Sequence, residues 1–380
     1  MKVRRGVGQL ELREIGVPEP GAGEVVLGVS HAGICGTDLH IAADEFPYWP
    51  PVVLGHEFTG RVIALGAGVD PCWAGRRVVC EPHAGACGHC YLCRRGDVQL
   101  CAEKRSPGWG VNGAFASQLT VPAALLHAVP DQLPSRAAVL AEPMAVVLSA
   151  LLRCPVTPGD TVVVTGPGPV GILAAIAARF AGAKAVIVLG RTQAAGSRLA
   201  IAAELGFLAT ADPAQASELV LAASAGRGAD LLVEASGAGQ AISTGIGLLR
   251  DRGRIAAVGL SGQPAIEVPW DRALRKSLDI VLSSSSAYPA WEPALVMLER
   301  CADQAAALVT EFPLAAWQLA FQAAGRRVVV KAALCPSEEG SCDDTSGADR
   351  WQRQAGPGLP GRPAGARVLG HERGPGPPAG

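Results

Sequence analysis

The chain has no apolar run that approaches the roughly 20 residues of a membrane-spanning helix. Residues 1–5 are not followed by the apolar core of a secretion signal. The formal charge is only −1 at pH 7, so bulk electrostatics give no reason to expect a nucleic-acid or membrane partner. No short-period internal repeat is present. We therefore expect a cytoplasmic protein, in a compartment where thiols stay reduced.

Two different patterns divide the 380 residues, which are enough for two hydrophobic cores. Up to about residue 150, short apolar runs such as residues 25–29 and 61–65 are bounded by glycine and proline, which predicts strands. Beyond Thr161, apolar runs alternate with helical segments such as residues 172–181. Those runs cover residues 162–164, 185–189, 231–234 and 254–258. Such alternation predicts an α/β fold with a parallel, doubly wound sheet.

The last segment, residues 337–380, is rich in glycine, proline, serine and charge. Such a composition cannot bury enough apolar surface to offset the entropy lost on ordering. We expect this tail to be disordered and dispensable for stability and turnover.

Four of the eleven cysteines crowd into the pattern C-x2-C-x2-C-x7-C, formed by Cys87, Cys90, Cys93 and Cys101. In a reducing compartment, such crowding indicates metal rather than disulfides. Four thiolates fill the tetrahedral coordination of zinc, which suits a structural ion. Buried free cysteines and a nucleic-acid-binding zinc ribbon are the alternatives, and the ribbon lacks its usual basic and aromatic surroundings.

A second set of possible zinc ligands is spread along the chain. Cys35 and His56 lie next to glycines, and both are ligand types of catalytic zinc, which keeps one position open for water or substrate. Glu142, directly before Pro143, is a candidate third ligand. Each of these residues alone is weak evidence, because a single Cys or His is more often a core residue and a Glu before Pro often starts a helix.

Taken together, these residues fit a known signature. Residues 55–69 match G-H-E-x2-G-x5-G-x2-V, the zinc alcohol dehydrogenase signature, at every defined position. The chain here resembles the medium-chain dehydrogenase family, and within it the sorbitol and threonine dehydrogenase branch. The resemblance runs from about residue 16 to 336, with the cysteine stretch, residues 35–38 and Glu142-Pro143 in the family's order. Residues 144–148 are closer to the polyol enzymes than to the threonine enzymes.

The resemblance implies that Cys35, His56 and Glu142 hold a catalytic zinc, with Glu57 beside it, bound directly or through water. The two ligand sets predict two zinc ions per chain. Zinc at this site would lower the pKa of the substrate hydroxyl, after which a hydride passes to a nicotinamide.

The resemblance also implies a path for the proton. Thr37 would carry the proton outward, and His40 could extend that relay, since an imidazole titrates near neutral pH. The alternatives are that Thr37 is a turn residue and His40 a surface residue.

The expected nucleotide site begins at residues 165–171, which contain G-x-G-x-x-G between a predicted strand and a predicted helix. Gly166, Gly168 and Gly171 permit a tight turn and close approach of a pyrophosphate. Pro169 and Val170 open the helix, whose N-terminus attracts anions. An ordinary glycine turn is the alternative.

The choice between NAD and NADP depends on Gly190 and Arg191. The acidic residue expected about 20 residues after the turn, which would hold the ribose of NAD, is replaced by Gly190. Arg191 offers a planar fork of donors to a 2′-phosphate. The sequence is therefore compatible with NAD or NADP as the cofactor, and it slightly favours NADP. The alternative is a solvent-exposed Arg191 in an enzyme that binds NAD through other contacts.

These observations predict a strand-rich catalytic domain, GroES-like by resemblance, at residues 1–151, with a zinc lobe at 87–101. A Rossmann domain would follow at 152–268, and residues 269–336 would return to complete the first domain. The expected active site is the cleft between the domains.

The predicted function is hydride transfer between NAD(P) and a small-molecule polyol or secondary alcohol. An L-threonine 3-dehydrogenase-like enzyme and a catalytically inactive cofactor-binding protein are the alternatives. Neither a nucleic-acid nor a membrane partner is expected, and the resemblance implies a homo-oligomer, either dimer or tetramer.

Overall fold

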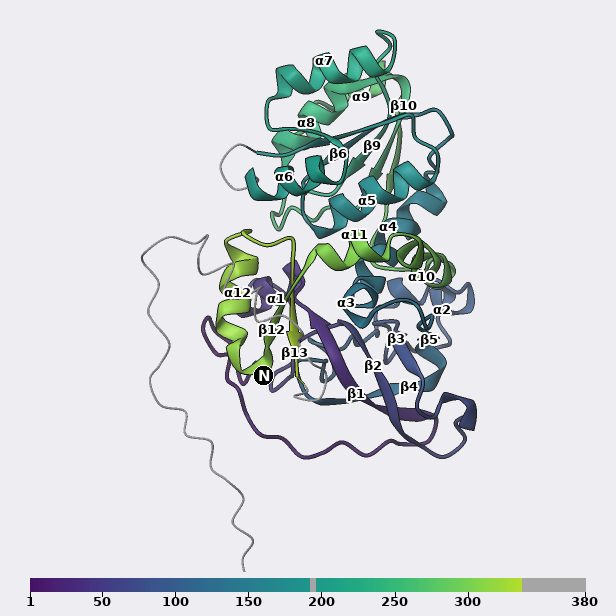
Figure 1. Ribbon diagram of the computed structural model, residues 1–380, viewed down its shortest axis with the longest axis vertical. Helices are drawn as coiled ribbons and strands as arrows, with labels where there is room; N and C mark the ends of the chain where they lie inside the picture. Colours follow the sequence, from purple (N-terminus) through teal and green to yellow (C-terminus); the bar gives the residue numbers. More distant parts are fainter. Residues whose placement is uncertain (192–195, 337–380) are drawn as a thin grey trace, which may run out of the picture.

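The computed structural model describes residues 1–191 and 196–336, so the tail expected at 337–380 lies outside the described part. Figure 1 shows two lobes that meet at a layer of helices. The chain builds most of the lower lobe first, then the upper lobe, and returns to the lower lobe with its last strands and helix.

The lower lobe is built on a seven-stranded sheet in the order β12-β13-β1-β2-β3-β5, with β4 also paired to β1. All its pairs are antiparallel except β12–β13. Branched side chains such as Val25, Leu27 and Val29 alternate into a core on one face, as expected of half-buried strands. The strands are β1 (Glu24–Gly33), β2 (Glu57–Leu65), β3 (Arg77–Cys80), β4 (Gln118–Pro122), β5 (Leu126–Ala128), β12 (Val309–Pro313) and β13 (Lys331–Cys335).

Short helices and turns complete this lobe. The helices are α1 (Gly36–Ala42), α2 (Tyr91–Arg94), α3 (Ser135–Ala138) and α12 (Trp317–Gly325). The 3-10 turns are η1 (Pro71–Trp73), η2 (Val98–Leu100), η3 (Ala123–Leu125) and η5 (Leu314–Ala316).

The upper lobe is a six-stranded, fully parallel sheet in the order β11-β10-β9-β6-β7-β8. The chain starts in the middle at β6, runs outward to β8, and crosses back to β9. This reversal creates a switch point between β6 and β9, where ligands bind in such sheets. The strands are β6 (Thr161–Thr165), β7 (Ala185–Leu189), β8 (Leu208–Thr210), β9 (Ala229–Glu234), β10 (Leu249–Ala257) and β11 (Asp279–Leu282).

Helices cover both faces of the parallel sheet (Figure 1), which confirms the predicted doubly wound α/β fold. They are α5 (Pro169–Phe180), α6 (Gly196–Glu204), α7 (Pro213–Ala223), α8 (Gly239–Leu248) and α9 (Trp270–Arg275). The predicted end of this domain at residue 268 precedes β11, which pairs with β10. The sheet therefore continues one strand past that boundary.

The layer between the lobes contains α4 (Ala141–Arg153), η4 (Tyr288–Ala290), α10 (Trp291–Arg300) and α11 (Ala302–Ala307). Helix α4 is buried on nearly every side, and one hydrophobic cluster runs from it through α5 and β6 to α10. Its alanines allow close packing against these neighbours. This core fixes the N-terminal end of α4, and hence Glu142, relative to both lobes.

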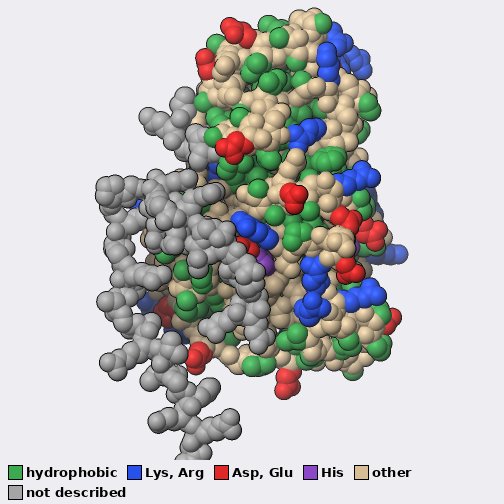
Figure 2. All heavy atoms as spheres, in the orientation of Figure 1, with side chains coloured by type: hydrophobic (Ala, Val, Ile, Leu, Met, Phe, Trp, Pro, Cys, Tyr) green, Lys and Arg blue, Asp and Glu red, His purple; other side chains and the backbone are tan. Residues whose placement is uncertain are grey.

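The surface carries both signs of charge. On the part of the face in Figure 2 that the grey atoms leave visible, Lys and Arg side chains are interspersed with Asp and Glu. This mixture agrees with the net charge of −1. Within the described ranges, no helix combines the length and the apolar character that crossing a bilayer requires.

Candidate active site, zinc centres and nucleotide site

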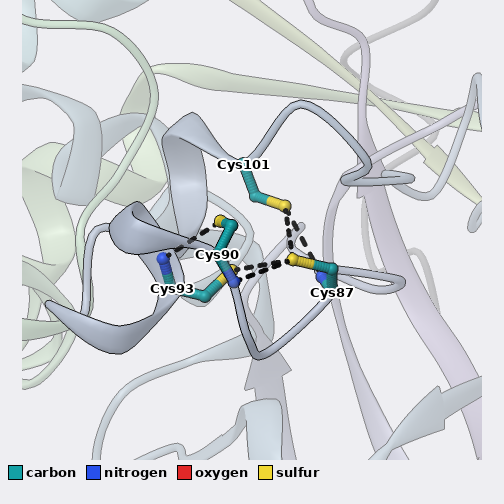
Figure 3. A group of neighbouring side chains, drawn as sticks. All are labelled: Cys87, Cys90, Cys93 and Cys101. Carbon is teal, nitrogen blue, oxygen red and sulfur yellow. Dashed lines mark hydrogen bonds between the residues drawn. The ribbon is translucent and has the colours of Figure 1, made fainter.

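The four cysteines of the predicted structural site lie together in one small lobe around α2 (Figure 3). Cys87 Sγ lies 3.9 Å from Cys93 Sγ and 3.7 Å from Cys101 Sγ. A disulfide would need about 2.05 Å. Zinc–sulfur bonds of about 2.3 Å in a tetrahedron separate the sulfurs by about 3.8 Å. The spacing therefore fits four thiolates around one zinc ion.

Backbone amides already favour thiolates in this lobe. The N–H groups of Cys90 and Cys93 donate to Cys87 Sγ and Cys90 Sγ, each at 3.4 Å, and Cys87 N donates to Cys101 Sγ at 3.5 Å. The bond from Cys87 lowers the pKa of Cys101 to about 6, whereas burial raises the pKa of Cys93 to about 12. Gly88, at a φ of +73°, provides the left-handed turn between the first two ligands.

A second group brings together Cys35, His56 and Glu57, whose ligand atoms lie within 4.8 Å of one another. Cys35 precedes α1, and Glu57 begins β2 directly after His56. Asp38 links the two segments: its carboxylate accepts the N–H of Cys35 at 2.8 Å and the N–H of Gly55 at 3.2 Å. Asp38 is fully buried, and its role was not predicted from the sequence.

This group fits a metal ion by its chemistry. His56 Nδ1 is buried and has no hydrogen-bond partner in the described structure. Burial, followed by the charge of Glu57, raises the pKa of the Cys35 thiol well above its usual range. A buried cation would stabilise the thiolate and give the imidazole a partner. Cysteine, histidine and carboxylate together are the donor types of a catalytic zinc.

Glu142 lies close by but outside that tight group. It is in the first turn of α4 and is 8% exposed. Burial raises its pKa to about 7, with attraction to His56 opposing and repulsion from Glu57 adding to the shift. Of the four predicted residues, the structure brings Cys35, His56 and Glu57 into one group. The fourth, Glu142, is close enough for the charges of His56 and Glu57 to affect its pKa.

Lys331 forms a buried ion pair with Glu57 and donates to the carbonyl of Ile34 at 3.2 Å. Both charged side chains are 2% exposed. Burial alone would lower the pKa of Lys331, but the charges of Glu57 and Cys35 outweigh it and raise that pKa. This lysine was not predicted from the sequence. The available signal was a single charge in the otherwise apolar run of residues 328–335.

The two predicted relay residues lie on α1. Thr37 Oγ1 is 3.8 Å from Cys35 Sγ, so the hydroxyl lies beside the metal-ligand group. His40 is exposed one turn later, and its Nδ1 is 2.9 Å from Glu45 Oε2. An atom added at Gly262 would lie 3.7 Å from the His40 ring, so His40 faces a loop of the upper lobe.

An aromatic wall borders the same site. The ring of Trp109 lies edge-on to the ring of His56, with centroids 5.0 Å apart, and also meets Phe46 at 5.6 Å. Trp49 N donates to the Trp109 carbonyl at 2.8 Å, which joins the two loops that carry these rings. Trp109 is a further neighbour of the site that was not predicted from the sequence.

The glycine-rich turn lies between β6 and α5, at the carboxyl end of the parallel sheet. Gly166 has a φ of +93°, which favours glycine. A Cβ at Gly171 would lie 1.8 Å from the carbonyl oxygen of Gly166, so no side chain fits there. A Cβ at Gly168 would meet only Arg198 Nη1, at 3.9 Å. The turn therefore leaves open space next to a cation at a helix N-terminus, as a pyrophosphate requires.

Gly190 and Arg191 follow β7. Gly190 N donates to the carbonyl of Thr210 at 3.0 Å, and the Arg191 side chain is exposed. Residues 192–195 lie outside the described part. Arg198 Nε donates to the carbonyl of Val329 at 2.8 Å, which ties the turn's neighbourhood to the lower lobe.

Two family models match the chain. The model described as "Alcohol dehydrogenase GroES-like domain" covers residues 21–131, and "Zinc-binding dehydrogenase" covers residues 169–300. These ranges fall on the lower and upper lobes respectively.

Curated relatives share most of the chain. A sorbitol dehydrogenase of Halalkalibacterium halodurans is 36% identical over 88% of this chain and 98% of the relative. A D-arabitol-phosphate dehydrogenase of Enterococcus avium is 31% identical over 83% and 91%. An L-threonine 3-dehydrogenase of Pyrococcus horikoshii is 35% identical over 68% and 75%.

Solved structures have the same architecture. The alcohol dehydrogenase TADH from Thermus sp. ATN1 matches with a TM-score of 0.77 and 30% identity, over 85% of this chain and 95% of that one. A zinc-binding dehydrogenase from Sinorhizobium meliloti bound to NADP gives 0.77 and 30%, over 87% and 97%. An alcohol dehydrogenase from Escherichia coli CFT073 complexed with NADH gives 0.77 and 29%, over 87% and 97%.

Proposed function

This chain belongs to the zinc-dependent medium-chain alcohol dehydrogenase family, and on that premise we propose that it oxidises a polyol or secondary alcohol to a ketone. It is an oxidoreductase that transfers a hydride between an alcohol and a nicotinamide cofactor. The polyol assignment is supported by the sorbitol dehydrogenase match, which covers more of both chains than the threonine enzyme does. Oxidation of L-threonine is the second candidate.

The observation that carries the proposal is the gathering of Cys35, His56 and Glu57 beside Glu142 at the junction of the lobes. We assign Cys35, His56 and Glu142 as ligands of the catalytic zinc, with Glu57 adjacent. When bound there, zinc supplies Lewis acidity that lowers the pKa of a substrate hydroxyl.

The protein's own groups then handle the proton and the orientation of the ligands. Thr37 Oγ1 would accept the proton of the substrate hydroxyl and pass it toward His40, which reaches solvent. The Asp38 carboxylate accepts backbone hydrogen bonds from Cys35 and from Gly55, which precedes His56, and so it positions both ligands. Lys331 neutralises Glu57, so that this carboxylate adds no net charge to the site.

For the second ion, we assign Cys87, Cys90, Cys93 and Cys101 to a structural zinc. The 3.7 and 3.9 Å sulfur separations and the inward amide donors support this assignment. With the catalytic ion, the chain would then hold two zinc ions in total.

The glycine turn of Gly166, Gly168 and Gly171, with Pro169 and Val170 opening α5, would hold the pyrophosphate. We propose that the enzyme prefers NADP. Gly190 has no carboxylate to repel a 2′-phosphate, and the exposed side chain of Arg191 could bind that phosphate. A charge-assisted bond of this kind is worth about 1.5–3 kcal/mol, or roughly ten- to a hundredfold in affinity. Arg191→Ala should weaken NADP selectively, and Gly190→Asp should shift the preference toward NAD. If the wild type clearly prefers NAD and Arg191→Ala leaves that preference unaltered, the proposed preference for NADP is wrong.

A homo-oligomer is supported by the outer strand β11. This strand ends the parallel sheet and exposes 39% of Ile280 and 70% of Leu282. The neighbouring α9 exposes 64% of Trp270. Apolar side chains on a free sheet edge favour pairing with another strand. We therefore propose that two copies pair there, and sedimentation of wild type against Leu282→Lys tests it.

The test of the function is cofactor reduction by zinc-loaded protein with sorbitol, arabitol, 2-butanol and L-threonine, each with NAD and with NADP. Turnover of the polyols or 2-butanol is expected, and it should vanish after chelation and return with zinc. A preference for L-threonine would favour the second candidate, and no turnover with any alcohol would contradict both.

A further inference from the structure

Three possible metal ligands lie together in the lower lobe, outside the two proposed zinc sets. His31 is in β1, Glu311 in β12 and Cys335 in β13, three neighbouring strands of the sheet. One ligand atom from each residue lies within 4.8 Å of the others. His31 is far from the other two in the sequence, so the fold itself brings a histidine, a carboxylate and a cysteine together.

The register of the strands explains why these side chains meet. Leu334 in β13 pairs with Ala32 in β1 and with Phe312 in β12. Phe312 and Leu334 pack into one hydrophobic cluster on their face of the sheet. Side chains alternate along a strand, so the residue next to each member of this row points to the opposite face. Those neighbours are His31, Glu311 and Cys335.

The group is largely buried. His31 and Glu311 expose only 16% and 12% of their side chains, and Cys335 is buried. His31 Nε2 lies 2.7 Å from Glu311 Oε1, so the carboxylate orients the ring. His31 Nδ1 is buried and has no hydrogen-bond partner in the part of the chain that the structure describes. No described donor therefore occupies Nδ1, and this nitrogen can take the ring proton when Nε2 binds an ion.

The donor types and the spacing fit zinc. Imidazole and carboxylate bind zinc at about 2.0–2.2 Å and thiolate at about 2.3 Å, so ligand atoms of one tetrahedron lie about 3.4–3.6 Å apart. The 2.7 Å contact of His31 with Glu311 would then open by about 0.7 Å, and Cys335 Sγ would move in from within 4.8 Å. Thiolate and imidazole favour zinc, whereas magnesium and calcium prefer oxygen ligands.

A cation lies on the other side of Glu311. Arg136 Nη1 is 3.8 Å from Glu311 Oε2, which is not the oxygen bonded to His31. The guanidinium also donates to the carbonyl of Val309 at 2.6 Å, and the side chain is 39% exposed. Arg136 therefore competes with an ion for the charge of Glu311 but approaches the other oxygen. Since the ion must also break the bond between His31 and Glu311, we expect weaker binding here than at the two zinc centres.

We propose that His31, Glu311 and Cys335 form a third zinc site, which takes up the ion reversibly and joins β1 to β12 and β13. Water would complete the tetrahedron. The site uses neither the alcohol nor the nicotinamide cofactor, so it goes beyond the proposed function. An ion that binds only the folded chain stabilises it, so zinc here should stabilise the lower lobe.

A second group of residues could bind added zinc instead. Cys87, His89 and Glu103 also have ligand atoms within 4.8 Å of one another, but His89 and Glu103 are exposed. His89 Nδ1 lies 2.7 Å from the Cys87 carbonyl oxygen, and Cys87 belongs to the proposed structural site. His89→Gln is therefore the matched control for His31→Gln.

The experiment titrates zinc into protein that has been loaded with zinc and dialysed to two ions per chain. Isothermal calorimetry measures the uptake of a further ion, and the melting temperature is recorded with and without it. The variants are His31→Gln and Cys335→Ser, with His89→Gln and Cys301→Ser as controls. Cys301 is buried like Cys335, but it belongs to no such ligand group within residues 1–191 and 196–336.

Wild type should bind one further zinc ion, which should raise the melting temperature by a few degrees. His31→Gln and Cys335→Ser should each weaken this binding at least about tenfold and remove the rise, because even the loss of a residue that only orients a metal ligand costs about ten- to a hundredfold in affinity. Both controls should bind the ion as wild type does. Arg136→Gln, which removes the competing cation, should tighten the binding severalfold. Magnesium in excess should not compete.

The proposal is overturned if wild type binds no third ion, or if His31→Gln and Cys335→Ser bind it unchanged. Loss of binding in His89→Gln alone would place the ion in the cysteine lobe and overturn the proposal as well. If Cys335→Ser fails to fold, His31→Gln and zinc-edge anomalous scattering from zinc-soaked wild-type crystals decide. A peak among the three side chains supports the site, and its absence contradicts it. A protein that oxidises no alcohol would refute the proposed function but leave these results unchanged.

Discussion

The two proposed sets of zinc ligands are built in opposite ways. The cysteine lobe takes all four ligands from residues 87–101, with one donor type and amide N–H groups from within the stretch. The proposed catalytic set takes Cys35, His56 and Glu142 from three separate segments, before α1, before β2 and in α4, and uses three donor types. Four thiolates would close the first site, whereas three protein ligands would leave one position of the second site open.

Because the two ligand sets are held differently, loss of the structural ion should lower stability, and loss of the catalytic ion should lower activity. Of residues 87–101 only Cys101 is buried, so this stretch has no apolar core of its own and we expect it to depend on its ion for its structure. The residues proposed as catalytic ligands are held without an ion, by Asp38, by the Glu57–Lys331 pair and by the core around α4. Loss of the catalytic ion should therefore remove activity while the fold persists.

The largest expected effect is that of Glu142→Ala on turnover. Loss of a zinc ligand should lower kcat/KM at least about a thousandfold, or about 4 kcal/mol, since the Lewis acid is worth several kcal/mol. Cofactor affinity, measured by fluorescence titration, should change little. Glu292→Ala is the matched control, because Glu292 also precedes a proline in the first turn of a helix but is exposed. Wild-type turnover in Glu142→Ala would remove this residue from the site.

Next in size is the effect of Cys93→Ser on stability. Loss of the structural ion should lower the melting temperature by roughly 10 °C, because its binding energy contributes to folding. Cys72→Ser, at an exposed cysteine, should leave the melting temperature unchanged. If calorimetry finds the same transition in Cys93→Ser as in wild type, with zinc content unaltered, the structural assignment is wrong.

Lys331→Met tests how the catalytic set is held. It leaves the Glu57 carboxylate buried without its partner, which should cost about 3 kcal/mol in the free energy of unfolding. Adding Glu57→Gln should restore part of that loss. Lys184→Met, at an exposed lysine, serves as the control in denaturant titrations. A double mutant no more stable than Lys331→Met would show that the pair is not coupled.

The smallest effect concerns pH. In the metal-free protein the pKa of Glu142 is raised to about 7, and the Cys35 pKa is higher still. Zinc uptake above pH 7 must then displace one proton, from Cys35, and below pH 7 it must displace two. The dissociation constant for zinc at this site should therefore fall about tenfold for each unit that the pH rises above 7, and about a hundredfold per unit below 7. Chelator competition measures it, and Glu142→Gln should remove the steepening; an unchanged profile would contradict the assigned cause.

The sequence predicted the parts that depend on local residues. The cysteine spacing and the glycine turn could be identified because every residue involved lies within 15 positions of the others. Strand β7 was placed at residues 185–189, as the structure has it, because its apolar run is bounded on both sides.

Contacts between distant segments could not be predicted in this way. The Glu57–Lys331 pair joins residues 274 positions apart, and it depends on β13 and β2 flanking β1 in the sheet. The end of the parallel sheet at β11 was missed, because a four-residue strand has little pattern of its own.

The central claim is that one chain holds a closed structural zinc and a separate catalytic zinc. Elemental analysis of wild type, Cys93→Ser and Glu142→Ala, each with its melting temperature, tests it most directly. The account predicts two, one and one zinc per chain, with a large fall in melting temperature only in Cys93→Ser. A single zinc in the wild type, or the loss of both ions in either variant, would contradict it.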